Sequence, residues 1–440
     1  MTPQSLVTIA ILLTLGVSGC DGGLENPPDV LVDFVHAAPS QGAIAFLREE
    51  RTATNLSYKR IDRAVFDSDV YDFHFEITPA GALKVRPVSF SKQLVAGTDY
   101  TIVATEVGGQ LQELILEAPS PDRDATNVQV ASLHVAPTLG AVDIFIEAPG
   151  ADLLSAVPLG TISFGEDLAP GPIVPGDYEF TLTAAANPAD VLLKSTSFSL
   201  AAGRSMLFSI VDGANEGIAP LAVVVSGDAN FSFVDRNLQS GIRVINAIAD
   251  RSMLDVGIDN EFSPPLFPAV AFGTVSAYDE SIAPGSHDLT ASPAGNPSVL
   301  EVNLPFAIDA GRLGTFFIAN PPGATTTIFS VDDYRPITGE GKLNLYNAAQ
   351  LYASVDIFIT PPAFDLNTIF PFSSLAPGGA ASGIPITQGD FEVTVREGGT
   401  VNVLAGPTPI TLNAGGFYGI LITDSIGGAT VDLTLLDDFP

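Results

Sequence analysis

The sequence has few of the residues from which catalytic and metal sites are built. Its 440 residues include no Trp, four His and one Cys, Cys20. Zinc sites need several Cys or His ligands at short spacing, and neither H-E-x-x-H nor H-x-H occurs. The P-loop, the G-x-G-x-x-G fingerprint and, after Cys20, the G-x-S-x-G elbow of hydrolases are also missing. We therefore predict a non-enzymatic protein with no cofactor and no bound metal.

Positive charge is also scarce. The chain carries 18 Lys and Arg against 50 Asp and Glu, a formal net charge of −32. Binding to phosphates needs clustered basic residues, so we expect neither nucleic acid nor electrostatic attachment to an anionic membrane surface. The simplest interpretation is that acidic side chains keep the protein soluble and its domains apart. The alternative is that acidic loops bind a divalent cation, although no D-x-[DN]-x-[DN]-G loop is present.

Short strand patterns dominate the chain, and long helical patterns are rare. Hydrophobic residues make up 46% of the sequence, and 41 Gly and 34 Pro separate runs rich in Val, Ile, Phe, Thr and Leu. Apolar and polar residues alternate at 142–146 and 391–395, as in strands with one buried face. Closely spaced strands of this kind indicate antiparallel β-sandwiches of roughly seven strands each.

One phrase occurs four times at intervals of about 100 residues, which indicates a repeated module. Each copy opens with a His or Asn, has an Asp or Ala nine positions later, and afterwards carries an Ala-Gly pair before another strand. The openings are His36, His134, Asn246 and Asn347; the later positions are Ala45, Asp143, Asp255 and Asp356; the glycines of the pairs are Gly97, Gly203, Gly311 and Gly415.

The length of the module suits a domain with its own core, because solenoid repeats are much shorter. We predict an all-β fold, a tandem array of four immunoglobulin-like antiparallel β-sandwich domains that fold as independent beads. The predicted boundaries are 30–125 for the divergent first repeat, 126–237 for the second, 238–337 for the third and 338–440 for the fourth.

The repeated polar positions are expected to be structural. Asn carries no titratable proton and could not replace a general base, whereas His and Asn can both bond a nearby backbone group. We therefore predict a strand-end cap at all four openings. The three repeated Asp alternate with apolar neighbours, so we expect them to face solvent or a sheet edge, where charge discourages aggregation. A binding role shared by these Asp is the alternative.

The first residues resemble a bacterial lipoprotein signal. Residues 1–19 contain no charged side chain, and the apolar stretch Leu6 to Val17 has the length of a signal peptide, too short to span a bilayer. The small residues before Cys20 resemble a lipobox, in which cleavage leaves the Cys as the first residue for acylation. Residues 20–29 then form the lipidated Cys and a flexible tether. The alternative is a plain secretory signal with a chance Cys.

The module also resembles a known bacterial family. The runs His134-Val-Ala-Pro, Val142-Asp143-Ile-Phe-Ile and Pro175-Gly-Asp-Tyr are similar to DUF4397, a family of domains of unknown function. The resemblance covers nearly all of the chain after the signal. It implies secreted or surface-anchored β domains with no established activity.

These observations lead us to expect a bacterial cell-envelope lipoprotein that faces the periplasm or the exterior. Its expected role is that of a surface scaffold or an adhesion and ligand-binding protein. The expected partners are the membrane, through acylated Cys20, and other envelope proteins or glycans. The alternative is an envelope enzyme, or an accessory subunit of a secreted enzyme, that acts on glycans or peptides.

Overall fold

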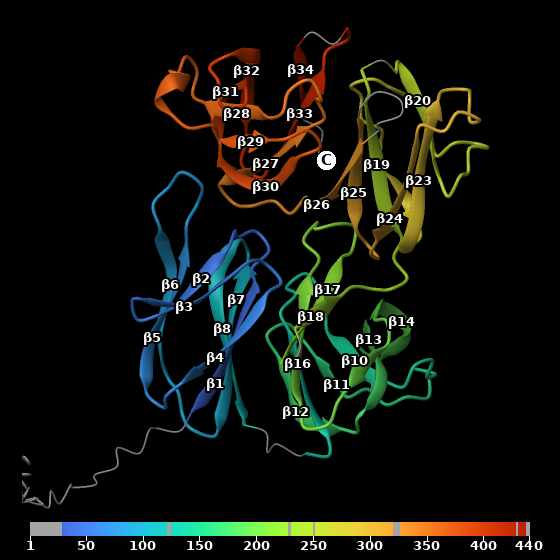
Figure 1. The fold of residues 1–440 in the computed structure, drawn as a ribbon. Coiled ribbons are helices and arrows are strands. Elements are labelled where there is room, and N and C mark those ends of the chain that lie inside the picture. Colours follow the sequence, from blue (N-terminus) through green and yellow to red (C-terminus); the bar gives the residue numbers. More distant parts are fainter. Residues whose placement is uncertain are drawn as a thin grey trace, which may run out of the picture.

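The computed structural model of the chain is almost entirely β-structure (Figure 1). It describes residues 29–120, 125–227, 230–249, 251–319, 326–427 and 430–436. Within these ranges, strands form two packed sheets in each repeat, so the prediction of β-sandwich domains is confirmed. No helix in the described part has the length and apolar character to cross a membrane. The predicted signal peptide, Cys20 and nearly all of the predicted tether lie outside the described residues.

Each domain consists of an inner sheet, which contains its first strand, and an outer sheet, which contains its second. The sheet orders are β4-β1-β7-β8 and β3-β2-β5-β6 in domain 1, and β12-β9-β16-β17-β18 and β11-β10-β13-β14 in domain 2, where β15 also pairs with β13. The strands of domain 1 are β1 (Val30–Ala37), β2 (Ile44–Arg48), β3 (Arg51–Leu56), β4 (Ile61–Phe66), β5 (Val70–Ile77), β6 (Val85–Gln93), β7 (Thr98–Val107) and β8 (Gln110–Pro119). Those of domain 2 are β9 (Val128–His134), β10 (Val142–Glu147), β11 (Gly160–Ile162), β12 (Asp167–Ile173), β13 (Gly176–Ala184), β14 (Asn187–Lys194), β15 (Phe198–Leu200), β16 (Ser205–Asp212), β17 (Leu221–Gly227) and β18 (Phe231–Phe233).

Domains 3 and 4 repeat this arrangement. The orders are β22-β19-β25-β26 and β21-β20-β23-β24 in domain 3, and β30-β27-β33-β34 and β29-β28-β31-β32 in domain 4. The strands of domain 3 are β19 (Ser240–Ala247), β20 (Met253–Ile258), β21 (Phe267–Ala271), β22 (Asp279–Ile282), β23 (Gly285–Pro293), β24 (Val302–Ile308), β25 (Leu313–Ala319) and β26 (Thr326–Asp332). Those of domain 4 are β27 (Glu340–Asn347), β28 (Val355–Thr360), β29 (Ser373–Leu375), β30 (Ala380–Thr387), β31 (Gly389–Glu397), β32 (Val403–Leu412), β33 (Phe417–Asp424) and β34 (Val431–Leu436), with the 3-10 helix η1 (Leu366–Thr368) before β29.

The first strand of each domain runs parallel to its neighbour in the inner sheet. β1 pairs in this way with β7, β9 with β16, β19 with β25 and β27 with β33. On its other side the first strand is antiparallel, as between β1 and β4. The inner sheets are therefore mixed, whereas the sequence led us to expect antiparallel strands throughout. A parallel pair needs a long crossover, and the strands of the outer sheet supply it.

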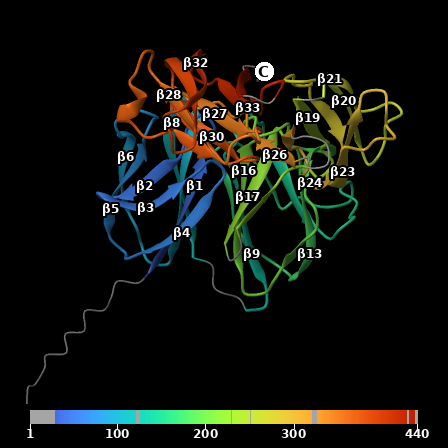
Figure 2. The same ribbon diagram turned by 45° about the horizontal axis from the view of Figure 1, so that its top comes forward.

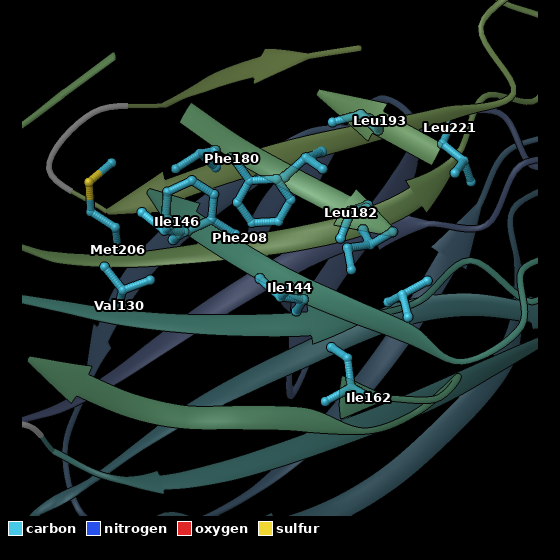
Figure 3. Packing of buried hydrophobic residues seen from close by; sticks show 14 of the residues in the cluster. Val130, Ile144, Ile146, Ile162, Phe180, Leu182, Leu193, Met206, Phe208 and Leu221 are labelled. Atoms are coloured by element: carbon cyan, nitrogen blue, oxygen red, sulfur yellow. The ribbon is translucent and has the colours of Figure 1, made fainter. Parts of the chain in front are cut away.

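Each domain has a core of its own between its two sheets. In domain 2, Ile144, Phe180 and Leu182 of the outer sheet meet Val130 and Phe208 of the inner sheet (Figure 3). The rings of Phe180 and Phe208 stack with their centroids 5.2 Å apart and their planes 6° from parallel. Burial of one such side chain contributes roughly 2 to 3 kcal/mol, so these contacts carry much of the stability of each sandwich.

The inner sheets are buried on both faces, which corrects the expectation of independent beads. On β1, Phe34 points into the core of domain 1, whereas Val35 and Ala37 pack against Leu133 and Val135 of domain 2. The residues on either side of the repeated His therefore form an apolar cluster between the two domains. Such a cluster removes from water a surface that a separate bead would expose.

Domains 3 and 4 pair in the same way. Ile245 and Ala247 share a cluster with Tyr346 and Ala348, and these residues flank the repeated Asn of each domain. The ring of Phe317 lies against that of Tyr346, with 3.9 Å between their centroids. The equivalent residues of each module thus build its interface with the neighbouring domain.

The chain consequently forms two back-to-back domain pairs that also touch each other (Figures 1 and 2). Domains 1 and 2 lie side by side, domain 3 lies next to domain 2, and domain 4 lies next to domain 1 (Figure 1). The amide of Ile218 donates to the carbonyl of Gly311 at 2.9 Å, and the amide of Thr338 donates to that of Ser40 at 2.8 Å. These bonds join the first pair to the second.

Candidate functional site

The four repeated openings are buried at or beside the end of the first strand of each domain. In domain 1, Nδ1 of His36 accepts the amide proton of Ala38 at 3.3 Å, and Nε2 lies 2.7 Å from the carbonyl of Gly42. In domain 4, Oδ1 of Asn347 accepts the amide proton of Ala349 at 3.1 Å, and Nδ2 donates to a carbonyl of β29 at 3.0 Å. His134 and Asn246 make the same pair of bonds in domains 2 and 3.

This pattern explains why His and Asn replace each other. Each bonding pattern needs one acceptor for the amide two residues later and one donor for a carbonyl, which lies in the following loop for the two His and on β21 or β29 for the two Asn. An Asn amide offers both, and so does a neutral imidazole that carries its proton on Nε2. An imidazole with both nitrogens engaged has none left to accept a proton from a substrate, so the positions act as links between strand and loop.

Burial keeps the two repeated His in the neutral form. It lowers the pKa of His36 from 6.5 to about 4; the carbonyl of Gly42 opposes this shift, and the charge of Arg335 adds to it. Burial also lowers the pKa of His134. The folded state therefore binds fewer protons at these sites than the unfolded state does at mildly acidic pH.

The replacement of His36 by Asn is expected to remove part of the acid sensitivity of the protein. Because the folded pKa is below the unfolded one, the contribution of His36 to stability is complete above pH 6.5 and is lost as the pH falls towards 4. The loss amounts to about 3 kcal/mol at most. Chemical unfolding at pH 7 and pH 4 measures it for both proteins. Equal losses of stability in the wild type and His36→Asn would contradict the assignment.

The three repeated Asp lie in interior strands of the outer sheets, which corrects the prediction that they face an edge; Asp143 and Asp356 are buried, and Asp255 is half-buried. β10 lies between β11 and β13, and Asp143 is 5% exposed. Its carboxylate accepts the hydroxyl proton of Thr161 and, at 2.7 Å, the amide proton of Ala186 in the turn after β13. Asp255 and Asp356 bond the equivalent turns, at Gly295 and Gly399. These carboxylates therefore fix hairpins.

The repeated Ala-Gly pair serves a turn before an inner strand. All four glycines have positive φ angles, from 69° at Gly311 to 78° at Gly97, and side chains other than Gly are strained there. At Gly311 space is also limited, because an added Cβ would lie 3.0 Å from the Cβ of Ala219 in domain 2. The glycine of the pair is thus needed for the backbone conformation of the turn.

Another repeated acid was missed at the sequence level. Asp212 ends β16, and its carboxylate accepts the hydroxyl proton of Thr138 in the loop after the repeated His. Burial raises the pKa of Asp212, and the bond to Thr138 opposes the shift. Glu106 and Asp424 bond the same loop in domains 1 and 4. The sequence does contain a signal for this position, because an acidic residue follows the repeated Gly by nine positions in three of the four copies.

The contact between the two domain pairs is centred on Arg335, in the linker from domain 3 to domain 4. Its Nη1 donates to the carbonyls of Pro39, at 2.7 Å, and Gln41, at 2.6 Å, in domain 1. Its guanidinium lies 4.9 Å from the centroid of the Tyr58 ring. The hydroxyl of Tyr58 in turn donates to the carbonyl of Asp212 in domain 2 at 2.8 Å. Arg335 therefore contacts domain 1 directly and is connected to domain 2 through Tyr58.

An ion pair supports the same junction. Glu216, in the loop between β16 and β17, lies 3.1 Å from Nζ of Lys59 in domain 1 and 3.8 Å from Nε of Arg335. Nζ of Lys59 also donates to the carbonyl of Gly213 at 3.0 Å. Burial lowers the pKa of Lys59, and the charge of Glu216 opposes that shift.

A hollow of about 890 Å³ opens beside this junction, where domains 1, 2 and 3 meet. Loop 57–60 of domain 1, Arg236 and Glu216 of domain 2 and Arg312 of domain 3 contribute to its walls. Such groups can bind and orient a charged or hydroxyl-rich ligand, and domain interfaces are common places for ligand sites. Within the part of the chain that the structure describes, no three His, Cys, Asp or Glu gather closely enough to hold a metal ion.

The fold and these sites define the class of protein, a tandem array of paired β-sandwich domains with a polar junction. The chain belongs to the DUF4397 family, described as a domain of unknown function, whose model matches residues 30–145 and 240–358. This confirms the resemblance to the family, over two regions that are shorter than the near-complete coverage expected from the sequence.

Two solved structures are similar to this chain. One is the Bacillus anthracis TIE protein, at 12% identity over 86% of this chain and 67% of that one, with a TM-score of 0.17. The other is a Bacteroides fragilis protein provisionally named a cell adhesion protein, at 9% identity over 72% and 98%, with a TM-score of 0.13. No curated protein matches the chain.

Proposed function

We propose that this chain is an exported cell-envelope lipoprotein that works as a scaffold and binding protein and catalyses no reaction. The observation that carries the proposal is the use of the repeated polar residues. His134 and Asp143, for example, bond loops and turns of their own domain. The residues that all copies share therefore stabilise the sandwiches. The junctions between domains and the loops that differ between copies remain as surfaces for partners.

The paired arrangement supports a scaffold role. Two apolar clusters hold the domains in pairs, and Arg335 joins one pair to the other. Fixed neighbours present their loops at set positions, which lowers the entropy cost when a partner binds. The polar hollow at the junction offers a place for a glycan or peptide ligand.

In this proposal Cys20 carries the acyl anchor, and the acidic domains extend from the membrane surface. Cells that express the wild type are expected to incorporate an alkyne-tagged fatty acid into the protein and to retain it in the membrane fraction. Cys20→Ser is expected to abolish the label and to release the protein or leave it with its signal peptide. Because Cys20 is the only Cys in the chain, no other thiol can take the label. Persistent labelling of Cys20→Ser, or an unlabelled wild type, would refute the anchor.

A further inference from the structure

Domains 2 and 4 carry matching loops between the second and third strands of the domain. We call residues 152–159, before β11, the domain 2 tip loop, and residues 365–372, before β29, the domain 4 tip loop. The first reads Asp-Leu-Leu-Ser-Ala-Val-Pro-Leu and the second Asp-Leu-Asn-Thr-Ile-Phe-Pro-Phe. Asp, Leu, a hydroxyl residue and Pro recur at the same places. The equivalent connection of domain 1 has only two residues, 49–50. That of domain 3, at 259–266, keeps Asp259 and Pro265 at the first and seventh places but has Asn260 and Phe262 in place of the Leu and the hydroxyl residue, and a proline, Pro264, directly before Pro265.

The domain 4 tip loop is held by its own hydrogen bonds. Oδ1 of Asp365 accepts the amide proton of Asn367 at 3.0 Å, and its carbonyl accepts the hydroxyl proton of Thr368 at 2.7 Å. At the other end the amide of Phe372 donates to the carbonyl of Ile357 on β28 at 2.8 Å. The start of the loop is thereby held by bonds within the loop, and its end is fixed to the sheet.

The domain 2 tip loop repeats the same three bonds. Oδ1 of Asp152 accepts the amide proton of Leu154 at 3.1 Å, and its carbonyl accepts the hydroxyl proton of Ser155 at 3.0 Å. The amide of Leu159 donates to the carbonyl of Ile144 on β10 at 2.7 Å. Two separate domains therefore hold the same loop conformation.

Both loops present a large apolar side chain to solvent directly before the proline. Phe370 is 92% exposed and Val157 is 80% exposed. The second residue after each is also exposed, Phe372 by 41% and Leu159 by 47%. The proline restricts the residue before it to extended backbone, so the apolar side chain is held in place. Side chains this exposed add little to the stability of the domain, and apolar groups clustered at a surface mark interaction sites.

The positions and charges of the loops indicate what they bind. The strands that bound them, β28 and β29 in one case and β10 and β11 in the other, lie in diagonally opposite domains (Figure 1), so the two loops are well separated. A second copy of the chain would bring another net charge of −32. The two basic residues of domain 4, Lys342 and Arg396, are both buried. The surface around that loop therefore complements a basic partner.

We propose that the two tip loops are docking elements for an envelope protein that offers an apolar pocket with a basic rim. Each loop inserts its exposed side chain, Val157 or Phe370, into one partner molecule, so the chain connects two of them. The proposal deepens the binding role proposed above and rests on it. Docking by the tip loops does not depend on acylation of Cys20, so the docking proposal and the lipoprotein proposal can fail separately.

The test begins with a photo-crosslinking amino acid at position 157, 370 or 401 of the full chain in the cells that produce it. Val401 is the control, because it is 74% exposed at the turn between β31 and β32 of the same domain. We expect one and the same protein to be crosslinked at 157 and at 370, and not at 401. The purified partner should then bind the wild-type full chain with a stoichiometry of two.

Substitutions identify the contacts. Val157→Ser and Phe370→Ser are each expected to reduce the stoichiometry to one, and the double variant to weaken binding by at least about tenfold. Val401→Ser should bind as the wild type does. Melting temperatures should stay unchanged, because both tip side chains are exposed.

Four results would each overturn the proposal. The first is that no single protein is crosslinked at both 157 and 370, and the next is that the double variant binds the partner with unchanged affinity. Another is a crosslink between two copies of the chain, together with dimers in sedimentation that form at higher concentration and that Phe370→Ser removes. The last is flotation of the Cys20→Ser protein with phosphatidylethanolamine–phosphatidylglycerol vesicles in a way that depends on Phe370. Lipid would then be what the loop binds.

Discussion

Replacement of Phe317 by Ala is expected to lower the free energy of unfolding of domains 3 and 4 by about 3 to 5 kcal/mol. Phe317 is 1% exposed, and its ring contacts Tyr346 across the domain interface. Leu421 and Ile245 belong to the same cluster, so the truncated side chain leaves a cavity that rigid sheets on both sides cannot close. Denaturant unfolding of the full chain measures the effect.

The matched control is the same substitution at Phe370, which is 92% exposed. Phe370→Ala is expected to change the free energy of unfolding by no more than about 0.5 kcal/mol. If Phe317→Ala were as mild as this control, the interface between domains 3 and 4 would not be a packed core. A separate domain 4 should also expose Tyr346 and Leu421 and therefore aggregate or melt earlier than in the pair.

Replacement of Arg335 by Ala is expected to separate the two domain pairs. The substitution removes two hydrogen bonds from a charged donor, to Pro39 and Gln41, and the contact with the ring of Tyr58. Bonds of this kind contribute roughly 1.5 to 3 kcal/mol each, so we expect a loss of about 3 kcal/mol in the docking of the pairs. Small-angle scattering should show a larger radius of gyration, while each pair keeps its own unfolding transition.

Arg312 provides the control at the same junction. Its side chain is exposed and donates to the carbonyl of Glu216 at 3.3 Å. Arg312→Ala should leave the radius of gyration unchanged. An unchanged radius for Arg335→Ala as well would mean that the remaining contacts, such as those of Thr338 and Ser40, are enough to hold the pairs together.

The strands and the repeat could be predicted because they depend on local patterns. Alternation at 142–146 and 391–395 does mark strands, β10 and β31, and the Ala-Gly pairs do precede inner strands. The roles of the repeated residues were harder to predict. Asp143 alternates with apolar neighbours as a solvent-facing residue would, yet a neighbouring strand and a hairpin turn cover it. Its burial depends on contacts with residues up to 43 positions away in the chain.

Pairing between domains was the main feature that local patterns did not reveal. The sequence of β25 did contain a signal for this pairing, because its run Thr315-Phe-Phe-Ile-Ala shows no apolar and polar alternation. In the structure all seven residues of β25 are buried. A strand without alternation is covered on both faces. The sequence does not say what covers the second face. In this chain the neighbouring module covers it, and only the three-dimensional arrangement of the domains could show this.

The back-to-back packing has a consequence for how such chains can change in length. Every module brings one apolar sheet face that must be covered, and its neighbour covers it. Modules can therefore be gained or lost without harm only in even numbers, because an odd one would leave an adhesive face in water. Loss of a single module would therefore be expected to cost more stability than loss of a pair, because only the single loss uncovers such a face.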